Sequence, residues 1–148
     1  MKKPPRLRVD HIGIAVENLE EARERFSKLL GASPSGVEEV PSEGVRVCFF
    51  ELGGCRIELL EAMTLDSPVK KFLDRGRTGV HHVSLALDGG DLGTLHEDLT
   101  ARGMPVLGPG PAPGSEGSRI FFVHPKATSG VLFEFSQKPS FPERGGAK

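Results

Sequence analysis

The 148-residue chain contains neither tryptophan nor tyrosine, and nine phenylalanines are its only large aromatic side chains. Proteins that bind single-stranded nucleic acid stack bases on aromatic side chains, so this composition disfavours such a site. Charge of either sign is not in excess either, because 19 basic and 20 acidic residues give a formal net charge of −1. Without a strong net field there is no long-range attraction for nucleic acid or for an anionic membrane surface.

Long apolar runs and cysteines are also scarce. No stretch approaches the roughly 18 to 20 apolar residues that a membrane-spanning helix needs. The basic start, MKKPPRLR, is not followed by the apolar segment of a secretory signal. The two cysteines, Cys48 and Cys55, lie seven residues apart in or beside apolar strand-like segments, a spacing that predicts reduced core thiols. We therefore expect a cytoplasmic protein with no nucleic-acid or membrane partner.

What the sequence does contain is an internal repeat. The segments VDHIGIAV and VHHVSLAL place His11 and His82 third in two similar strand-like runs, 71 residues apart. A helical segment that ends at a glycine, Gly31 or Gly103, follows each run. The first helix has a predicted N-cap at Asn18. Its expected apolar face consists of Leu19, Ala22, Phe26, Leu29 and Leu30, and the face of the second consists of Leu92, Leu95 and Leu99.

Each half of the repeat then adds further strands. Segments 44–52 and 55–62 form one predicted hairpin, and segments 118–125 and 129–137 form its counterpart. Between the halves, a serine cap and a proline at the first helical position predict a short linking helix over about 66–75. The resulting order is β-α-β-β-β, twice.

We therefore predict an α+β fold in which two βαβββ modules are related by a pseudo-two-fold axis. The whole chain, 1–148, forms one domain, with the first module at about 7–64 and the second at about 79–137. The curved mixed sheets of the two modules should enclose a central groove. The final segment, 138–148, is expected to be a frayed tail.

The last strand of each half carries a carboxylate among apolar residues, Glu58 in RIELL and Glu134 in VLFEF. A buried carboxylate without a partner is costly, so each of them needs one. The pseudo-two-fold relation brings both carboxylates to one groove with His11 and His82, where two imidazoles and two carboxylates neutralise a divalent cation. Mixed nitrogen and oxygen ligation favours transition metals over Ca²⁺ or Mg²⁺ alone. Taken singly, however, each of these residues is more ordinary as a core or solvent-facing side chain.

The three remaining histidines have different expected roles. His81 occupies the place of Asp10 in the repeat, which predicts a structural role or support of the neighbouring ligand. His96 falls on the second helix and is expected to face solvent. His124 precedes Pro125 and is a candidate for a strand end near the site.

These residues carry a resemblance to the vicinal oxygen chelate superfamily and, within it, to the methylmalonyl-CoA epimerases. The similar stretches are LRVDHIGIAVENLEEA, IELLEAMTLDSPVKKFL, GVHHVSLAL and FFVHPKATSGVLFEFSQ, so the resemblance covers about 7–137. Paired strand histidines and glutamates recur widely, whereas DSPVKKFL followed by HHVSLAL and then HPK…GVLFEF is much more specific. Glyoxalase I has a similar ligand pattern, but it usually shows an Asp-Pro-rich turn where this chain has HPK.

The resemblance implies a homodimeric enzyme that epimerises methylmalonyl-CoA at C2 through an enolate, with one divalent metal ion. Co²⁺ and Mn²⁺ are the first choices for that ion, with Ni²⁺, Zn²⁺ and Mg²⁺ as alternatives. It assigns the metal to His11, Glu58, His82 and Glu134, although some members have glutamine in place of Glu58. Glu134 is also implied as one of the two acid/base groups.

The second acid/base group does not carry over. The bacterial pattern GV-x-E places a glutamate where this chain has Val47. Glu43 is our candidate in its place, with Glu51, His124 or a water molecule as alternatives, and a solvated turn residue is an equally open interpretation of Glu43. For the coenzyme A part of the substrate, the resemblance and the loop positions suggest Lys126, Ser115, Gly117, Ser118 and His124.

The same residues are compatible with two other functions. One is a glyoxalase-like isomerase that acts on a thiol adduct. The other is a metal-free module that binds a small ligand or drug, although such modules have usually lost the ligand residues and this chain retains all four. A dioxygenase is disfavoured because it typically needs a facial triad with three open positions.

Overall fold

The computed structural model describes residues 4–76 and 79–139. Most of the expected frayed tail, 138–148, lies outside the described residues. No helix within the described ranges is long and apolar enough to cross a membrane. The elements are β1 (Arg6–Ala15), α1 (Leu19–Leu30), β2 (Glu38–Val40), η1 (Pro41–Glu43), β3 (Val45–Leu52), β4 (Cys55–Ala62), α2 (Pro68–Asp74), β5 (Gly79–Asp88), α3 (Leu92–Ala101), β6 (Ala112–Pro113), η2 (Ser115–Gly117), β7 (Arg119–Val123), η3 (Pro125–Ala127) and β8 (Phe133–Gln137).

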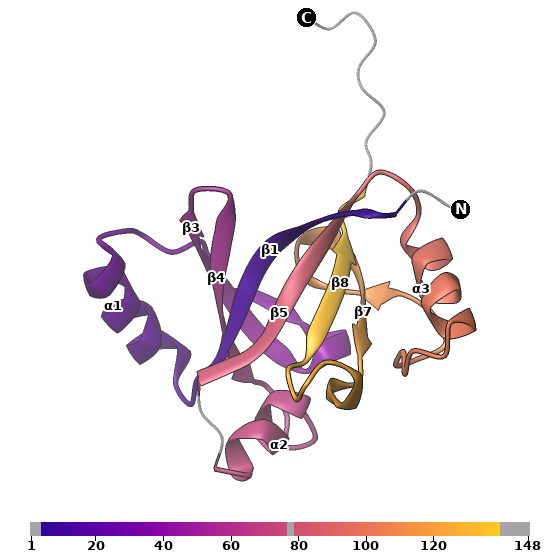
Figure 1. The fold of residues 1–148 in the computed structure, drawn as a ribbon. Helices are drawn as coiled ribbons and strands as arrows, with labels where there is room; N and C mark the ends of the chain where they lie inside the picture. The colour runs from indigo at the N-terminus through magenta and orange to yellow at the C-terminus, as the bar shows by residue number, and fades with distance from the viewer. Residues whose placement is uncertain (1–3, 77–78, 140–148) are drawn as a thin grey trace, which may run out of the picture.

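The strands form one eight-stranded sheet with the order β2-β3-β4-β1-β5-β8-β7-β6. This order reads symmetrically outward from the antiparallel pair β1 and β5, with β4 parallel to β1 and β8 parallel to β5. Figure 1 shows α1 and α3 at opposite sides of the molecule with the central strands between them. The α+β fold of two βαβββ modules is therefore confirmed, and the two modules share one continuous curled sheet.

Helix α1 shows why the first module folds as its sequence predicts. The Asn18 side chain accepts a hydrogen bond from the Glu21 N–H at 3.0 Å, and Gly31 ends the helix in the left-handed region at φ 61°. The helix packs on one face of the sheet against Cys48, Phe50 and Leu59, while alternate residues of β3 and β4 face the other way. One expectation is wrong: Leu29 is 75% exposed, because it lies to one side of the covered stripe that continues through Phe26 to Leu30. The opposite face of the sheet borders the central cavity. Buried residues on this face are Val45, Val47, Phe49, Glu58 and Leu60.

Helix α3 covers the second module, and here the prediction for His96 is wrong. His96 is only 7% exposed, with its Nε2 3.1 Å from the carbonyl oxygen of Gly108 and its ring edge-on to Phe121. The physical reason is helical periodicity, because His96 follows Leu92 by four residues and shares its buried face. The carbonyl satisfies the imidazole, so a polar residue is tolerated in this core position.

Candidate metal centre and active site

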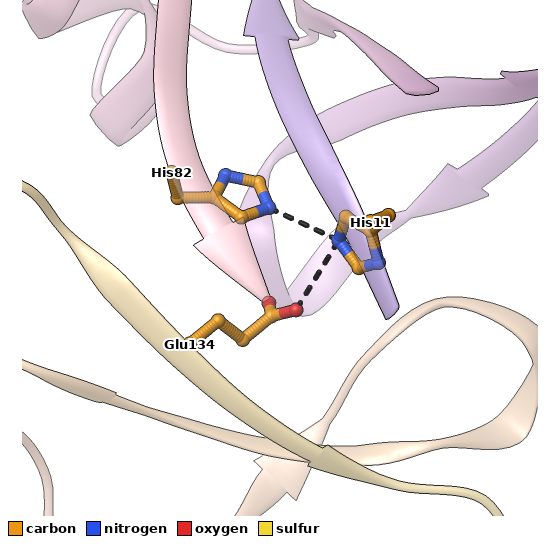
Figure 2. Close-up of side chains that lie close together, drawn as sticks. All are labelled: His11, His82 and Glu134. Atoms are coloured by element: carbon orange, nitrogen blue, oxygen red, sulfur yellow. Dashed lines mark hydrogen bonds and ion pairs between the residues drawn. The ribbon is translucent and has the colours of Figure 1, made fainter. Parts of the chain in front are cut away.

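Four neighbouring strands, β4, β1, β5 and β8, bring the predicted ligands to one point. His11 Nε2 lies 3.1 Å from His82 Nε2 and 3.4 Å from Glu134 Oε1, and Figure 2 shows these three side chains converging. Glu58 Oε1 lies 3.4 Å from His11 Nε2 and 3.2 Å from His82 Nε2. All four residues are at most 6% exposed. A group of two histidines and two glutamates is therefore gathered in a buried cluster.

The cluster depends on the small size of Gly13. Gly13 faces His82 across the β1–β5 pair. A Cβ atom at Gly13 would lie 2.2 Å from Cε1 of the His82 ring, far inside van der Waals contact. The lack of a Cβ atom at Gly13 thus makes room for the imidazole.

Asp10 fixes the state of His11. The Asp10 carboxylate lies 2.7 Å from His11 Nδ1 and accepts a hydrogen bond from Arg56 at 2.8 Å. Burial opposes ionisation of Asp10, but the hydrogen bonds from His11 and Arg56 prevail and hold its pKa well below the usual range. His11 therefore donates Nδ1–H to a carboxylate, and in neutral His11 the lone pair of Nε2 points at the cluster.

His81 takes the corresponding place beside the second ligand. Its Nδ1 lies 2.9 Å from His82 Nδ1. Burial, helped by the charge of His82, lowers the pKa of His81 to about 4, so His81 is neutral at physiological pH. When His82 donates Nδ1–H to neutral His81, its Nε2 lone pair also faces the cluster. This contact agrees with the supporting role that the repeat predicts for His81.

The electrostatics of the cluster indicate a need for positive charge. Burial disfavours a charged His11, yet the hydrogen bonds that it donates to Asp10 and Glu58, with the charges of Glu58 and Glu134, raise its pKa to about 10. Burial also opposes ionisation of Glu58, but its hydrogen bonds with the two histidines lower its pKa to about 2. The pKa of Glu134 is raised, mainly by burial. His11, His82 and Glu134 each offer a ligand atom within 4.8 Å of the others, and Glu58 contacts both histidines. This mixed nitrogen and oxygen set suits a divalent ion, because such an ion would replace the shared protons.

Glu43 lies at the edge of the same cavity, in η1. It is half-buried rather than solvated. Burial, with the nearby charge of Glu134, raises its pKa to about 7. A carboxyl group with such a pKa suits a general acid or base at neutral pH. Val47 lines this cavity too but offers no group that can exchange a proton.

The remaining candidates divide between the cavity and the outer surface. Ser115 and Ser118 line the cavity, whereas Gly117 is not among the described residues that do so. His124 is exposed and accepts a hydrogen bond from the Lys126 N–H at 3.0 Å, and neither side chain lines the cavity in the described part of the chain. The Glu51 side chain is 74% exposed.

Sequence reasoning missed Arg56 and Glu116, which also line the cavity. Arg56 donates hydrogen bonds to Asp10 and, at 2.9 Å, to Glu116. The available signal was strand periodicity, because Arg56 stands two residues before Glu58 and so points to the same face of β4. Nothing local in the sequence marks Glu116, which lies 60 positions further along the chain from Arg56.

Comparisons with known proteins agree with this geometry. Residues 10–122 match the family described as the Glyoxalase/Bleomycin resistance protein/Dioxygenase superfamily. The mitochondrial methylmalonyl-CoA epimerase of Mus musculus is 35% identical over 131 residues, which cover 88% of this chain and 72% of that protein. The ethylmalonyl-CoA/methylmalonyl-CoA epimerase of Cereibacter sphaeroides is 35% identical over 132 residues, covering 88% of this chain and 97% of that one.

A solved structure extends the similarity to three dimensions. It is a variant of the Streptomyces coelicolor methylmalonyl-CoA epimerase in complex with 2-nitronate-propionyl-CoA. The two chains are 33% identical, with a TM-score of 0.83 and coverage of 92% of this chain and 97% of that one. The repeat, the shared sheet and these matches lead to one assignment. The chain belongs to the glyoxalase, bleomycin resistance protein and dioxygenase superfamily and, within it, to the enzyme family of the methylmalonyl-CoA epimerases.

Proposed function

We propose that this protein interconverts the two C2 epimers of methylmalonyl-CoA and that the reaction depends on a divalent metal ion. The observation that carries the proposal is one cavity that holds both the buried histidine–glutamate cluster and Glu43, a carboxyl group with a pKa raised to about 7. The named relatives are epimerases of malonyl-CoA derivatives, which supports this reaction over a glyoxalase-like isomerisation.

The chemistry needs an acidified C–H bond and a proton carrier on each face of the carbon. A divalent ion held by His11, Glu58, His82 and Glu134 would act as a Lewis acid on the thioester oxygen and the substrate carboxylate. One of the two carboxyl groups, Glu43 or Glu134, removes the C2 proton and leaves a planar enolate. The other returns a proton to the opposite face, which inverts the centre with no net gain or loss of protons.

The environment of Glu43 supports its role. Burial, with the nearby charge of Glu134, raises the pKa of Glu43 to about 7. A base matched to neutral pH removes a weakly acidic carbon-bound proton better than an ordinary surface carboxylate does. The two groups come from different modules, Glu43 from η1 and Glu134 from β8, so they approach the cavity from different elements.

The finer parts of the proposal follow the same resemblance. We infer Co²⁺ or Mn²⁺ as the ion, with Ni²⁺, Zn²⁺ or Mg²⁺ as alternatives, and a homodimer that acts in the cytoplasm. Ser115 and Ser118 line the cavity and suit contacts with the coenzyme A arm. Lys126, His124 and Gly117 stand outside the cavity lining in the described ranges, so any contact they make is with the outer part of the coenzyme.

The direct test is proton exchange at C2. Purified protein is incubated with methylmalonyl-CoA of one configuration in D₂O, and C2 deuteration is followed by NMR while chiral analysis follows inversion. We expect both to proceed much faster than in buffer alone, since the acid/base pair exchanges its protons with solvent. Exchange at the buffer rate, with and without added Co²⁺ or Mn²⁺, would refute the proposed reaction.

Metal dependence is tested separately. Dialysis against a strong chelator should reduce epimerisation to the buffer rate, and one equivalent of Co²⁺ should restore it, because removing the ion leaves no Lewis acid for the thioester oxygen. Elemental analysis should find about one transition-metal ion per chain before dialysis. Full activity in protein shown to be free of metal would contradict this part of the proposal.

A further inference from the structure

Arg56 is a buried cation that neither the metal ligands nor the acid/base pair accounts for. The residue is 8% exposed and lies on β4, on the face that carries Glu58. Its guanidinium covers the ring of Phe49, with Cζ 3.9 Å from the ring centroid. A buried guanidinium without partners is costly, so its partners indicate what it does.

The two ends of the guanidinium fork contact two carboxylates from different modules. Arg56 Nη2 donates to Asp10 Oδ2 at 2.8 Å, and Arg56 Nη1 donates to Glu116 Oε1 at 2.9 Å. The same Asp10 oxygen lies 2.7 Å from His11 Nδ1. A continuous chain of hydrogen bonds therefore runs from Glu116 through Arg56 and Asp10 to His11.

Glu116 is held in an unusual conformation. Its backbone has φ 54° and ψ 33°, in the left-handed region that residues with a side chain rarely adopt. Its N–H donates to both carboxylate oxygens of Glu38 in β2, at 2.9 and 3.0 Å. Its own second carboxylate oxygen lies 3.4 Å from Lys138 Nζ. Contacts from the first module thus hold a strained residue of the second.

These contacts belong to a seam that closes the curled sheet. β2 and β6 are the two edge strands of the sheet. The Ser42 hydroxyl in η1 donates to the carbonyl oxygen of Pro113 in β6 at 3.0 Å. The segment from the end of β6 through η2 to Ser118, called loop 113–118 below, lines the central cavity, so the seam forms one wall of the site.

We propose that Arg56 and Glu116 are positioning residues for the metal centre, which couple the seating of loop 113–118 on β2 to the orientation of His11. An imidazole ligand that donates its second N–H to a carboxylate has a fixed tautomer and ring orientation. Here the carboxylate itself is fixed by Arg56, and Arg56 is fixed by the loop. The inference rests on the proposed function, because it assumes that His11 binds a metal ion.

Two glutamates near Arg56 provide a test variant and a matched control. Glu116→Gln removes the charge at the loop end of the hydrogen-bond chain, and its side chain is 37% exposed, so the variant should fold. Glu51→Gln removes another carboxylate near Arg56, but that contact is 4.0 Å long and Glu51 is 74% exposed. The readouts are the Co²⁺ dissociation constant from calorimetry and the visible spectrum of the Co²⁺ protein, both without substrate.

Glu116→Gln should weaken Co²⁺ binding by about 2-fold to 30-fold and alter the visible bands, while Glu51→Gln should match wild type. Arg56→Lys should behave like Glu116→Gln, because a single ammonium cannot bridge both carboxylates as the planar fork does. The double variant should add little, since both changes break the same chain.

Equal Co²⁺ affinity and equal spectra for Glu116→Gln and Glu51→Gln would overturn the inference and leave the proposed function intact. Additive effects of Arg56→Lys and Glu116→Gln on Co²⁺ affinity would overturn it as well. Additivity would mean that the two residues act independently and not through one chain of hydrogen bonds. A wild-type protein that binds no divalent ion would instead refute the proposed metal centre itself, and this inference with it.

Discussion

Glu43→Gln should lower the rate of epimerisation by about 100-fold or more, because it removes one of the two acid/base groups that inversion needs. Deuterium exchange at C2 should persist for one epimer, without inversion, since Glu134 can still remove and return a proton on its own face. The measurement is the epimerisation rate by chiral analysis beside the exchange rate of each epimer by NMR. Co²⁺ affinity should stay at the wild-type value, because Glu43 is not one of the proposed ligands.

Glu39→Gln is the matched control for this experiment, since Glu39 is an exposed carboxylate on the neighbouring strand β2. It should leave both rates unchanged. If Glu43→Gln epimerises within twofold of wild type, Glu43 is not an acid/base group and the second base must be sought elsewhere. Glu134→Gln should also abolish epimerisation, but it is a less specific test because Glu134 is proposed as both ligand and base.

The raised pKa of Glu43 allows the melting temperature to show whether the Glu43→Gln variant is folded. A carboxyl whose folded pKa is about 7, above its usual value of 4.5, holds its proton more tightly in the folded state. Its ionisation therefore costs stability as the pH rises from about 4.5 through 7. Above pH 7 the chelated Glu43→Gln protein lacks this cost and should melt no lower than chelated wild type. A lower melting temperature would indicate a structural fault instead of a lost base.

Gly13→Ala should weaken Co²⁺ binding by about 10-fold to 100-fold and reduce epimerisation with it. The added Cβ would lie 2.2 Å from Cε1 of His82, so the imidazole must turn away from the cluster. Overpacking of this kind costs about 1 to 3 kcal/mol of stability, which an otherwise intact fold tolerates. Displacing His82 should reduce the affinity for Co²⁺ at least as much as removing a hydrogen bond that orients a metal-binding side chain. Calorimetric titration with Co²⁺ and the epimerisation assay measure the two effects.

Gly36→Ala controls for the change from glycine to alanine, because a Cβ at Gly36 meets nothing within 4 Å. It should leave Co²⁺ affinity and activity unchanged. Normal Co²⁺ affinity in the Gly13→Ala protein would show either that His82 is not a ligand or that the ring reaches the metal from another position. In that case the proposed four-residue ligand set would need revision.

Much of the architecture follows from local patterns in the sequence. The repeat of VDHIGIAV and VHHVSLAL, each followed by a capped helix and further strands, is sufficient to predict two βαβββ modules. Alternation along a strand fixes which residues share a face, and the pseudo-two-fold relation of the repeat then predicts that His11, Glu58, His82 and Glu134 face one groove. The same reasoning explains why Asn18 and Gly31 mark the ends of α1. These features depend on residues only a few positions apart.

The predictions that are wrong, and the properties that the sequence does not reveal, depend on tertiary contacts and not on local conformation. Leu29 is exposed because the part of α1 that the sheet covers does not extend to it. His96 is buried because it shares the face of Leu92 and finds a hydrogen-bonding partner in the Gly108 carbonyl oxygen. Glu43 lies in a short turn in the sequence, and only the cavity wall raises its pKa to about 7. Residue type and spacing carry no information about such desolvation.

The contacts that support the proposed metal ligands are the part that only the tertiary structure decided. The sequence by itself determined the repeat and the strands, since these follow from periodicity and capping. The four candidate ligands came from the repeat together with the family resemblance. The links from Arg56 to Asp10 and Glu116 span 46 and 60 positions and two modules. Arg56 reaches Asp10 across the paired strands β4 and β1, and it reaches Glu116 because the segment that follows the edge strand β6 lines the same cavity, where buried charges must find partners.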